Sequence, residues 1–179
     1  QDFISVTPSN VDFIAISTVQ VVSIAASLIP FFEHDDANRA LMGSNMQRQS
    51  VPLILPQKPI VGTGLENQIA MDSGLTLNSQ FSGIVNLVTA NKIIISNNNG
   101  KKSIYKLQKY LRSNQQTCIN QRPIVWKGER IKSGQILTDG PAITSSELSL
   151  GQNVLVGYMP WQGYNFEDAV VISNRLVKT

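Results

Sequence analysis

Residues 81–107 read FSGIVNLVTANKIIISNNNGKKSIYKL. Three short runs in this stretch, at 84–88, 92–96 and 104–107, are rich in the branched and aromatic residues that favour strands. The cluster Asn97-Asn98-Asn99-Gly100 separates the last two runs and is typical of a hairpin turn. The stretch therefore predicts an antiparallel β-meander.

Residues 124–137 continue the β-rich pattern with short apolar runs separated by Gly128 and Gly134. This rhythm of strand and turn resembles the small sandwich-barrel motif that biotinyl and lipoyl carrier domains also use. A carrier would need a modifiable lysine flanked by Met or Ala at a hairpin tip, and that pattern is missing. We therefore interpret 124–137 as a structural part of the fold and not as a carrier site, and we expect a mixed α/β fold that is mostly β.

One prominent helix is expected before the β-rich part, so that the chain divides into a strand and helix segment, 1–52, and a β-rich segment, 53–179. Asp35 is the predicted N-cap, Asp36 favours the positive end of the helix dipole, and the helix is expected to run to about Ser50. Pro52 stops it.

This helix carries an unusual stripe of polar and sulfur-containing residues. At about 100° per residue, an arc of roughly 80° collects Arg39, Met42, Met46 and Gln49, with Asn45 at its edge. Arg binds phosphate through a planar fork, and amides can contact sugar or base edges. The stripe thus suggests a binding face, and the alternative is a half-buried helix that packs its methionines on a neighbour.

Two adjacent carboxylates, Glu167 and Asp168, end the motif GYNFED at 163–168. An apolar run at 154–159 precedes them and predicts a buried strand, and a second apolar run follows at 169–172. Buried carboxylates are costly unless they are capped, paired with cations or bound to a metal. We expect the pair to lie where a loop re-enters a core, and, if it is extended, its side chains cannot both ligate one ion.

The first part of the chain is apolar. Two strand-like runs are predicted at 3–6 and 13–16, with a turn at 7–10 between them. The apolar run 19–32 is interrupted by polar residues and ended by Pro30 well short of the roughly 20 residues that a membrane span needs. We interpret it as buried core.

Three further patterns each have a structural and a functional interpretation. Residues 33–35 are acidic around His34 and suggest capping and a solvated charge run in preference to a metal cluster. Residues 62–64, Gly-Thr-Gly, suggest a structural turn in preference to a phosphate loop, because the full motifs are absent. A basic patch suggests a solvated hairpin rim or a contact with a nucleic-acid backbone; it comprises Lys101, Lys102, Lys106, Lys109 and Arg112, with Tyr105 and Tyr110.

The composition limits the possible classes of protein. The 179 residues are 42% hydrophobic, enough for a core, and the net charge is only +3. Any nucleic-acid contact must therefore come from local placement of cations. Cys118 is the only cysteine, which excludes an internal disulfide and a cysteine-based zinc site. We expect the chain to be an internal piece of a longer protein, since it begins at Gln1 and ends at Thr179 without an obvious cap.

Six ordered motifs together resemble the second-largest (beta) subunit of bacterial and plastid DNA-directed RNA polymerase. They are EHDDANRALMGSNMQRQ at 33–49, VP at 51–52, GTG at 62–64, RSNQ at 112–115, TCINQ at 117–121 and MPWQGYNFED at 159–168. The resemblance implies the hybrid-binding region of that subunit. It further implies a part of the enzyme's catalytic core, a nucleotidyltransferase that makes templated RNA from ribonucleoside triphosphates by two-metal transfer, inactive as this piece alone.

The resemblance also implies a role for each candidate site residue. Glu167 and Asp168 match an acidic pair near the second, nucleotide-borne Mg²⁺, with Asp168 binding it directly or through water and Glu167 nearby. Arg39 matches an arginine that approaches the triphosphate. Asn45 and Gln49 match residues near the RNA 3′ end and the hybrid. The main Mg²⁺ would be held by aspartates of the partner beta-prime subunit.

The implied partners are the beta-prime and alpha subunits, a sigma factor in the holoenzyme, the DNA template, the RNA–DNA hybrid and nucleoside triphosphates. Abundant Ile, Asn and Lys indicate an AT-rich genome and favour the plastid (chloroplast) stroma over a bacterial cytoplasm. Gln162 stands where the bacterial motif commonly has Asn, and the family's two downstream lysines lie beyond Thr179. The alternatives are a structural subunit-interaction module, which would tolerate loss of the acidic pair, and a biotinyl-like carrier.

Overall fold

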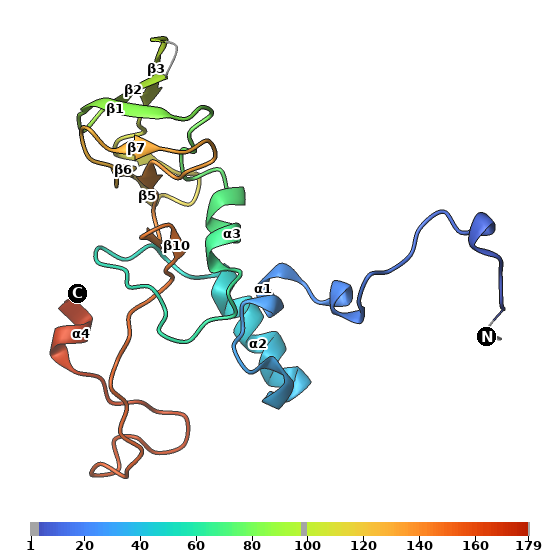
Figure 1. Ribbon diagram of the computed structural model, residues 1–179. Helices are drawn as coiled ribbons and strands as arrows, with labels where there is room; N and C mark the ends of the chain where they lie inside the picture. The colour runs from blue at the N-terminus through green and yellow to red at the C-terminus, as the bar shows by residue number, and fades with distance from the viewer. Residues whose placement is uncertain (1–3, 98–99, 179) are drawn as a thin grey trace.

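The computed structural model describes residues 4–97 and 100–178. Its largest sheet is antiparallel, with strand order β3-β2-β1-β7 (Figure 1). The strands are β1 (Gly83–Val88), β2 (Lys92–Asn97), β3 (Lys102–Lys106) and β7 (Arg130–Ile131). The predicted meander is therefore confirmed, although Asn98 and Asn99 of the predicted turn lie outside the described residues.

One face of this sheet carries the hydrophobic core. Val85 of β1 lies opposite Ile95 of β2, and both side chains are buried together with Ile93. Because side chains alternate between the two faces of a strand, these residues share one face. The other buried members of the core are Ile131 of β7 and, from the segments around the sheet, Leu107, Val125 and Leu137.

The remaining strands form three short antiparallel pairs. These are β4 (Leu111–Arg112) with β5 (Cys118–Ile119), β6 (Arg122–Pro123) with β8 (Thr138–Asp139), and β9 (Ile143–Thr144) with β10 (Glu147–Leu148). The fold is thus mixed α/β with mostly antiparallel strands, as predicted. Within residues 4–97 and 100–178 the strands do not close into a barrel.

The stretch 124–137 has turns at both predicted glycines, since Gly128 and Gly134 have φ of 88° and 81°. Between them it contributes only the two-residue strand β7 to the main sheet. Gly128 and Glu129 also bond to the backbone of Val85 in β1, and the Leu137 amide donates to the carbonyl of Leu77 at 2.8 Å, in the segment before the sheet.

The helices are short apart from one. They are α1 (Ile24–Ser27), α2 (Ala37–Arg48), α3 (Glu66–Asp72) and α4 (Asn174–Lys178), with 3-10 turns at η1 (Pro8–Asn10), η2 (Thr18–Val21) and η3 (Phe32–His34). None of the helices in the described ranges is long and apolar enough to cross a membrane.

The predicted boundaries of α2 are corrected by one or two residues. Its N-cap is Asp36 and not Asp35, because Asp36 Oδ2 accepts a hydrogen bond from the Asn38 amide at 3.1 Å. Asp35 instead ends the preceding turn η3. The helix stops at Arg48, and Gln49 is its C-cap.

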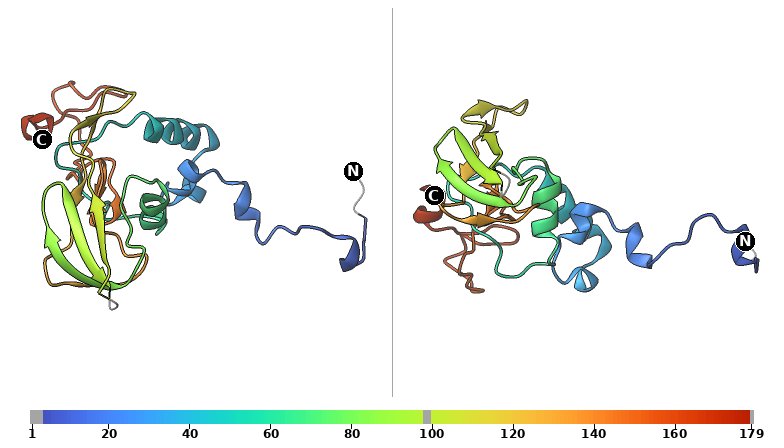
Figure 2. Two further views of the ribbon diagram at one scale, coloured as in Figure 1. Left: turned by 90° about the horizontal axis from the view of Figure 1, so that it is seen from above. Right: turned by 45° about the horizontal axis from the view of Figure 1, so that its top comes forward.

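Two predictions for the N-terminal part of the chain are wrong. Residues 4–23 extend away from the body of the molecule (Figures 1 and 2) and contain 3-10 turns but no strand. Phe3, the first residue of the run predicted at 3–6, lies outside the described residues. The run 19–32 is not buried core, since Val21, Ile24 and Phe31 are exposed. Residues 25–29 of this run are half-buried where they pack on α2, but the described residues offer no layer that covers the rest of it.

Candidate functional site

Helix α2 packs on α1 through a face of small residues. Ala40 and Ser44 are buried, and a Cβ at Gly43 would lie 3.9 Å from Ile29 Cδ1. Positions i, i+3 and i+4 share one side of a helix, so this face fixes which side of α2 turns outward.

The polar stripe predicted from the sequence lies on the opposite side of α2. Met42 and Met46 are 48% and 65% exposed, and Arg39 is exposed with its Nη1 3.6 Å from Met42 Sδ. Asn45 is half-buried and accepts a hydrogen bond from Arg48, whereas Gln49 is exposed. The described residues therefore contradict the alternative in which the methionines pack on a neighbour.

The acidic pair lies in a C-terminal loop, and the buried strand predicted before it is absent. Residues 154–159 form no strand, and Leu155 and Tyr158 are almost fully exposed. A strand needs a paired edge for its backbone groups, and no neighbouring strand lies beside this run in the described chain.

Residues 159–165 are held by the side chain of Asn165. Its Oδ1 accepts a hydrogen bond from the Trp161 amide at 2.9 Å, and its Nδ2 donates to the Met159 carbonyl at 2.6 Å. Within this loop the Tyr164 amide donates to the Trp161 carbonyl at 3.0 Å. Gln162 and Gly163 between them have φ of 51° and 75°, which is the pattern of a type I′ turn.

Glu167 and Asp168 occupy the next turn, closed by the Ala169 amide donating to the Phe166 carbonyl at 3.2 Å. Glu167 has a φ of 55°, so the pair is not extended. Both residues are exposed, and no group among the described residues donates a hydrogen bond or forms an ion pair with either carboxylate. The expectation that they re-enter a core is therefore wrong for this loop, and the argument against a shared ion no longer applies.

These two carboxylates fit a Mg²⁺ ion only if other molecules supply the remaining ligands. Among residues 4–97 and 100–178 no group of three or more His, Cys, Asp and Glu residues could hold a metal. Magnesium usually takes one or two protein carboxylates and completes its shell with water and phosphate oxygens. The exposed oxygens of Glu167 and Asp168 suit that arrangement.

The structure keeps the two predicted groups separate. In Figure 1, α2 and the loop that precedes α4 lie apart, and no described hydrogen bond or ion pair joins Arg39, Asn45 or Gln49 to the acidic pair. The stripe is assembled by one helix and the carboxylates by one turn. A single site containing both would need contacts beyond those described within this chain.

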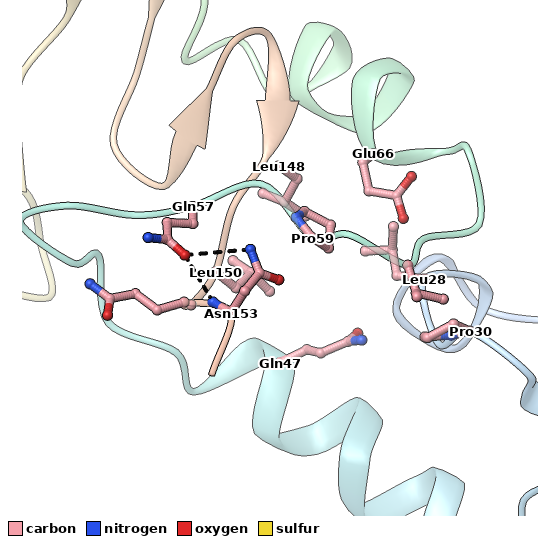
Figure 3. Close-up of a pocket in the computed structure, with 12 residues that line it drawn as sticks. Leu28, Pro30, Gln47, Gln57, Pro59, Glu66, Leu148, Leu150 and Asn153 are labelled. Atoms are coloured by element: carbon pink, nitrogen blue, oxygen red, sulfur yellow. Dashed lines mark hydrogen bonds between the residues drawn. The ribbon is translucent and has the colours of Figure 1, made fainter. Parts of the chain in front are cut away.

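A pocket of about 230 Å³ lies elsewhere, between the α1–α2 region and the segments 57–66 and 148–153 (Figure 3). Gln57 Oε1 accepts hydrogen bonds there from the backbone amide and Nδ2 of Asn153, at 3.1 and 3.4 Å. Gln47 of α2 lines the pocket, and its buried Oε1 has no hydrogen-bond partner among the described residues. No predicted site residue lines it. The only feature of the sequence that could have indicated this role for Gln47 is that a polar residue lies on the side of the helix opposite the stripe.

The Gly-Thr-Gly stretch is a structural turn, as predicted. The carboxylate of buried Glu66 accepts hydrogen bonds from the amides of Thr63 and Gly64, both at 2.8 Å. Burial raises the pKa of Glu66, but hydrogen bonds from its own backbone amide and from Thr63 and Gly64 together lower it more, so the net pKa lies below its ordinary value. The amides that a phosphate would use are already occupied.

The other two ambiguous patterns have different outcomes. His34 Nε2 lies 3.7 Å from Glu33 Oε1 on an exposed surface, and the described chain forms no metal cluster there. In the basic patch, Lys109 Nζ donates to the Gln121 carbonyl at 2.8 Å and lies 5.4 Å from the Tyr110 ring centroid. Both interpretations of that patch remain predictions.

Comparison with known proteins gives consistent similarities. Residues 78–179 match the family model described as RNA polymerase Rpb2, domain 6. The chain is 82% identical over 177 residues to the DNA-directed RNA polymerase subunit beta of Phaeodactylum tricornutum, which covers 99% of this chain and 13% of that protein. Subunits of the same name are 64% identical over 177 residues in Porphyra purpurea and 61% over 178 residues in Thermosynechococcus vestitus, each covering 99% of this chain. The chain spans 13 to 16% of the length of these relatives.

Proposed function

The chain belongs to the beta-subunit family of DNA-directed RNA polymerases, and from this premise we propose that it forms part of the catalytic core of such an enzyme. The reaction is templated RNA synthesis from ribonucleoside triphosphates by two-metal nucleotidyl transfer. The chain contributes binding groups to that reaction and is inactive without the other subunits. These are the beta-prime and alpha subunits, with a sigma factor in the holoenzyme, working in a plastid stroma or a bacterial cytoplasm.

The exposed stripe on α2 is the observation that carries this proposal. The small face of Ala40 and Ser44 is used for packing, which leaves Arg39 free on the other side of the helix. A guanidinium binds phosphate oxygens through charge-assisted hydrogen bonds. In the proposed enzyme Arg39 therefore contacts the triphosphate, and the amides of Asn45 and Gln49 contact the RNA 3′ end or the hybrid.

The acidic turn supplies the second group. Glu167 and Asp168 are exposed and unpaired within the described chain, so their oxygens are available to an ion that arrives with a nucleotide. Bound there, Mg²⁺ would neutralise triphosphate charge and orient the leaving group. Asp168 is the proposed ligand, directly or through water, and Glu167 lies beside it.

The separation of the two groups supports the need for other subunits. The acidic turn carries only two carboxylates, and no described contact joins it to Arg39. In the proposed enzyme the partner beta-prime subunit holds the main Mg²⁺ and the nucleic acid, and this places the stripe and the acidic turn around one nucleotide. We further propose that the short strand pairs and the 124–137 turns become part of a sandwich-barrel motif in the complete subunit.

A structural subunit-interaction role is the second candidate. It is favoured by the apolar side chains that 154–172 expose, among them Leu155, Tyr158 and Val170. Exposed apolar surface of this extent marks protein contacts. This role would leave the acidic pair dispensable, which separates it from the first candidate. The carrier role has no comparable support, because the lysine in the 126–129 turn, Lys127, is flanked by Trp126 and Gly128.

The deciding experiment is single-nucleotide addition on a preassembled RNA–DNA scaffold by the complete polymerase carrying Asp168→Asn. Magnesium is titrated at fixed nucleotide, and scaffold binding is measured separately. We expect a raised magnesium requirement with intact scaffold binding. Asp72→Asn is the matched control, because Asp72 is an exposed carboxylate on α3. A titration identical to wild type would favour the structural role and remove Asp168 from the site.

A further inference from the structure

The outward face of the main sheet is unexplained by the proposed catalytic role. Cross-strand register places Leu87 opposite Ile94, and Ile94 opposite Ile104, so these three residues form one row across β1, β2 and β3. Directly opposite residues share a face, and this is the face away from buried Val85, Ile93 and Ile95. Leu87 is 38% and Ile104 60% exposed. The row is an apolar stripe on the surface.

Cations border the apolar row on both sides. On one side Lys92 lies directly opposite Lys106. On the other side Lys102 lies opposite Ser96, and Arg130 of β7 lies opposite Ile84. All four cations are exposed, and none forms an ion pair with a described residue. The outward positions of the four strands include no Asp or Glu.

The Lys92–Lys106 pair is unfavourable as it stands. Like charges directly opposite each other on one face of a sheet are destabilising, whereas opposite charges stabilise the pair. Such an arrangement gains stability when carboxylates or other anions approach the face. The apolar row beside this pair requires a partner that is also partly apolar, because the free energy falls when Leu and Ile side chains are removed from water.

The apolar row and the cations that border it together favour one class of partner. Nucleic acid would satisfy the cations, but single strands bind proteins by stacking bases on aromatic rings, and the outward row is aliphatic. Tyr105, the aromatic residue of β3, belongs to the opposite face, where it pairs with buried Ile93 and its hydroxyl accepts a hydrogen bond from the Gln80 amide at 3.0 Å. An acidic protein segment with an apolar side matches both the row and its borders.

We propose that this sheet face docks an acidic amphipathic helix of a partner protein. Neighbouring strands are about 4.8 Å apart, so the row of three residues spans roughly 10 Å. Residues i, i+4 and i+7 of a helix share one side and span about 10 Å along its axis. A helix lying across the strands therefore places three apolar residues over Leu87, Ile94 and Ile104. Its flanking carboxylates meet Lys92 and Lys106 on one side and Lys102 and Arg130 on the other.

The position of the face is compatible with a separate partner. In Figure 1 the sheet is at the opposite end of the molecule from the C-terminal loop and α4, and no helix crosses strands β1–β3. The extended N-terminal segment also leads away from it (Figure 2). Binding there does not compete with the stripe of α2 or with the acidic turn.

The test uses the assembled polymerase and two synthetic helical peptides. One peptide carries Leu at i, i+4 and i+7 with Glu on both flanks, and its matched control has Lys in place of every Glu. Binding is measured by fluorescence anisotropy. We expect the wild-type enzyme to bind the Glu peptide, and the double variant Lys92→Glu with Lys106→Glu to bind it at least tenfold more weakly while gaining affinity for the Lys peptide. Single-nucleotide addition should be unchanged.

Controls make each outcome decisive. Lys178→Glu changes another exposed cation, on α4, and should leave peptide binding unaltered. If the double variant fails to assemble, Ile104→Ser and Lys106→Gln test the row and its border separately. Equal binding of both peptides, or no binding, overturns the proposal. Competition by oligo-dT or by anionic vesicles that depends on Lys92 and Lys106 would also overturn it, in favour of nucleic acid or lipid.

Discussion

The side-chain oxygen of Asn165 accepts a hydrogen bond from the backbone amide of Trp161 at 2.9 Å. The same side chain donates to the Met159 carbonyl, so one amide group closes the loop that precedes Glu167 and Asp168. Asn165 is also the one half-buried residue of 161–170, whose other members are exposed. The loop conformation therefore depends on hydrogen bonds more than on packing.

We predict that Asn165→Ala lowers the free energy of local opening of residues 159–165 by about 1 to 2 kcal/mol, because two hydrogen bonds are lost. Hydrogen exchange of this loop in the assembled enzyme should increase. Asn165→Asp is the informative comparison, because a carboxylate still accepts from the Trp161 amide but cannot donate to the Met159 carbonyl. Its exchange should fall between wild type and Asn165→Ala. Exchange unchanged in both variants would mean that other contacts hold the loop.

The turn inside this loop allows predictions of opposite sign. Gln162 has a φ of 51°, a conformation in which Asn is far more acceptable than Gln. We expect Gln162→Asn to give an Asn-Gly type I′ turn and to slow exchange of the Tyr164 amide, with a gain of several tenths of a kcal/mol. Gly163→Ala should speed exchange of the same amide. The space beside Gly163 is open, but its φ of 75° would strain an alanine and destabilise the turn by about 1 kcal/mol. The same direction of change in both variants would contradict the turn assignment.

Local patterns predicted local structure well. The meander at 84–107 followed from alternating residues and an Asn-Gly cluster, both of which act within a few residues. Helix α2 followed from its cap and its proline stop, with an error of one residue at the N-cap. The stripe containing Arg39 was also predicted, because helical spacing alone decides which side chains share a face.

The errors concern burial and positive φ. Runs such as 13–16, 19–32 and 154–159 are apolar, and the sequence shows that they favour burial but not which element covers them. Glu167 at a φ of 55° was not predictable, because a non-glycine residue in that region is held there by its turn and not by its own preference. The missed pocket residue Gln47 depends on segments more than 100 residues apart meeting in space, as 28–47 and 148–153 do.

A charge-assisted contact from Arg39 to the triphosphate predicts a kinetic defect. Arg39→Ala should lower kcat/KM for the nucleotide in the assembled polymerase, by an amount that corresponds to a loss of about 1 to 3 kcal/mol of transition-state stabilisation. Arg39→Lys should recover part of the loss, because it keeps the charge but not the planar fork. The measurement is single-nucleotide addition over a range of nucleotide concentrations.

Arg122→Ala is the control for loss of an exposed arginine, and it should leave the nucleotide dependence unchanged. Hydrogen exchange of α2 should also be unaltered in Arg39→Ala, since the helix packs through Ala40 and Ser44 and not through the arginine. Faster exchange of α2 with normal kinetics would instead give Arg39 a structural role.

Glu66 predicts a pH-dependent local stability. Burial raises the folded-state pKa of Glu66, but hydrogen bonds from its own backbone amide and from Thr63 and Gly64 together lower it more, so the pKa lies below the ordinary value. The stabilisation is therefore complete above the ordinary pKa of a glutamate and is lost as the pH falls through the lowered pKa. Glu66→Gln should remove most of it at neutral pH, about 1 to 3 kcal/mol, because an amide oxygen replaces a carboxylate and the NH₂ group cannot accept.

Exchange of the Thr63 and Gly64 amides in the assembled enzyme measures this effect, with Asp72→Asn on the same helix as the matched loss of an exposed carboxylate. Gly62→Ala should resemble Glu66→Gln, since its added Cβ would lie 2.5 Å from Glu66 Oε1 and must displace the carboxylate. Both variants should speed exchange at the two amides, whereas Asp72→Asn should not. If Glu66→Gln left the exchange unchanged, the turn would be held by its glycines alone, and the two amides would again be candidates for binding an external anion.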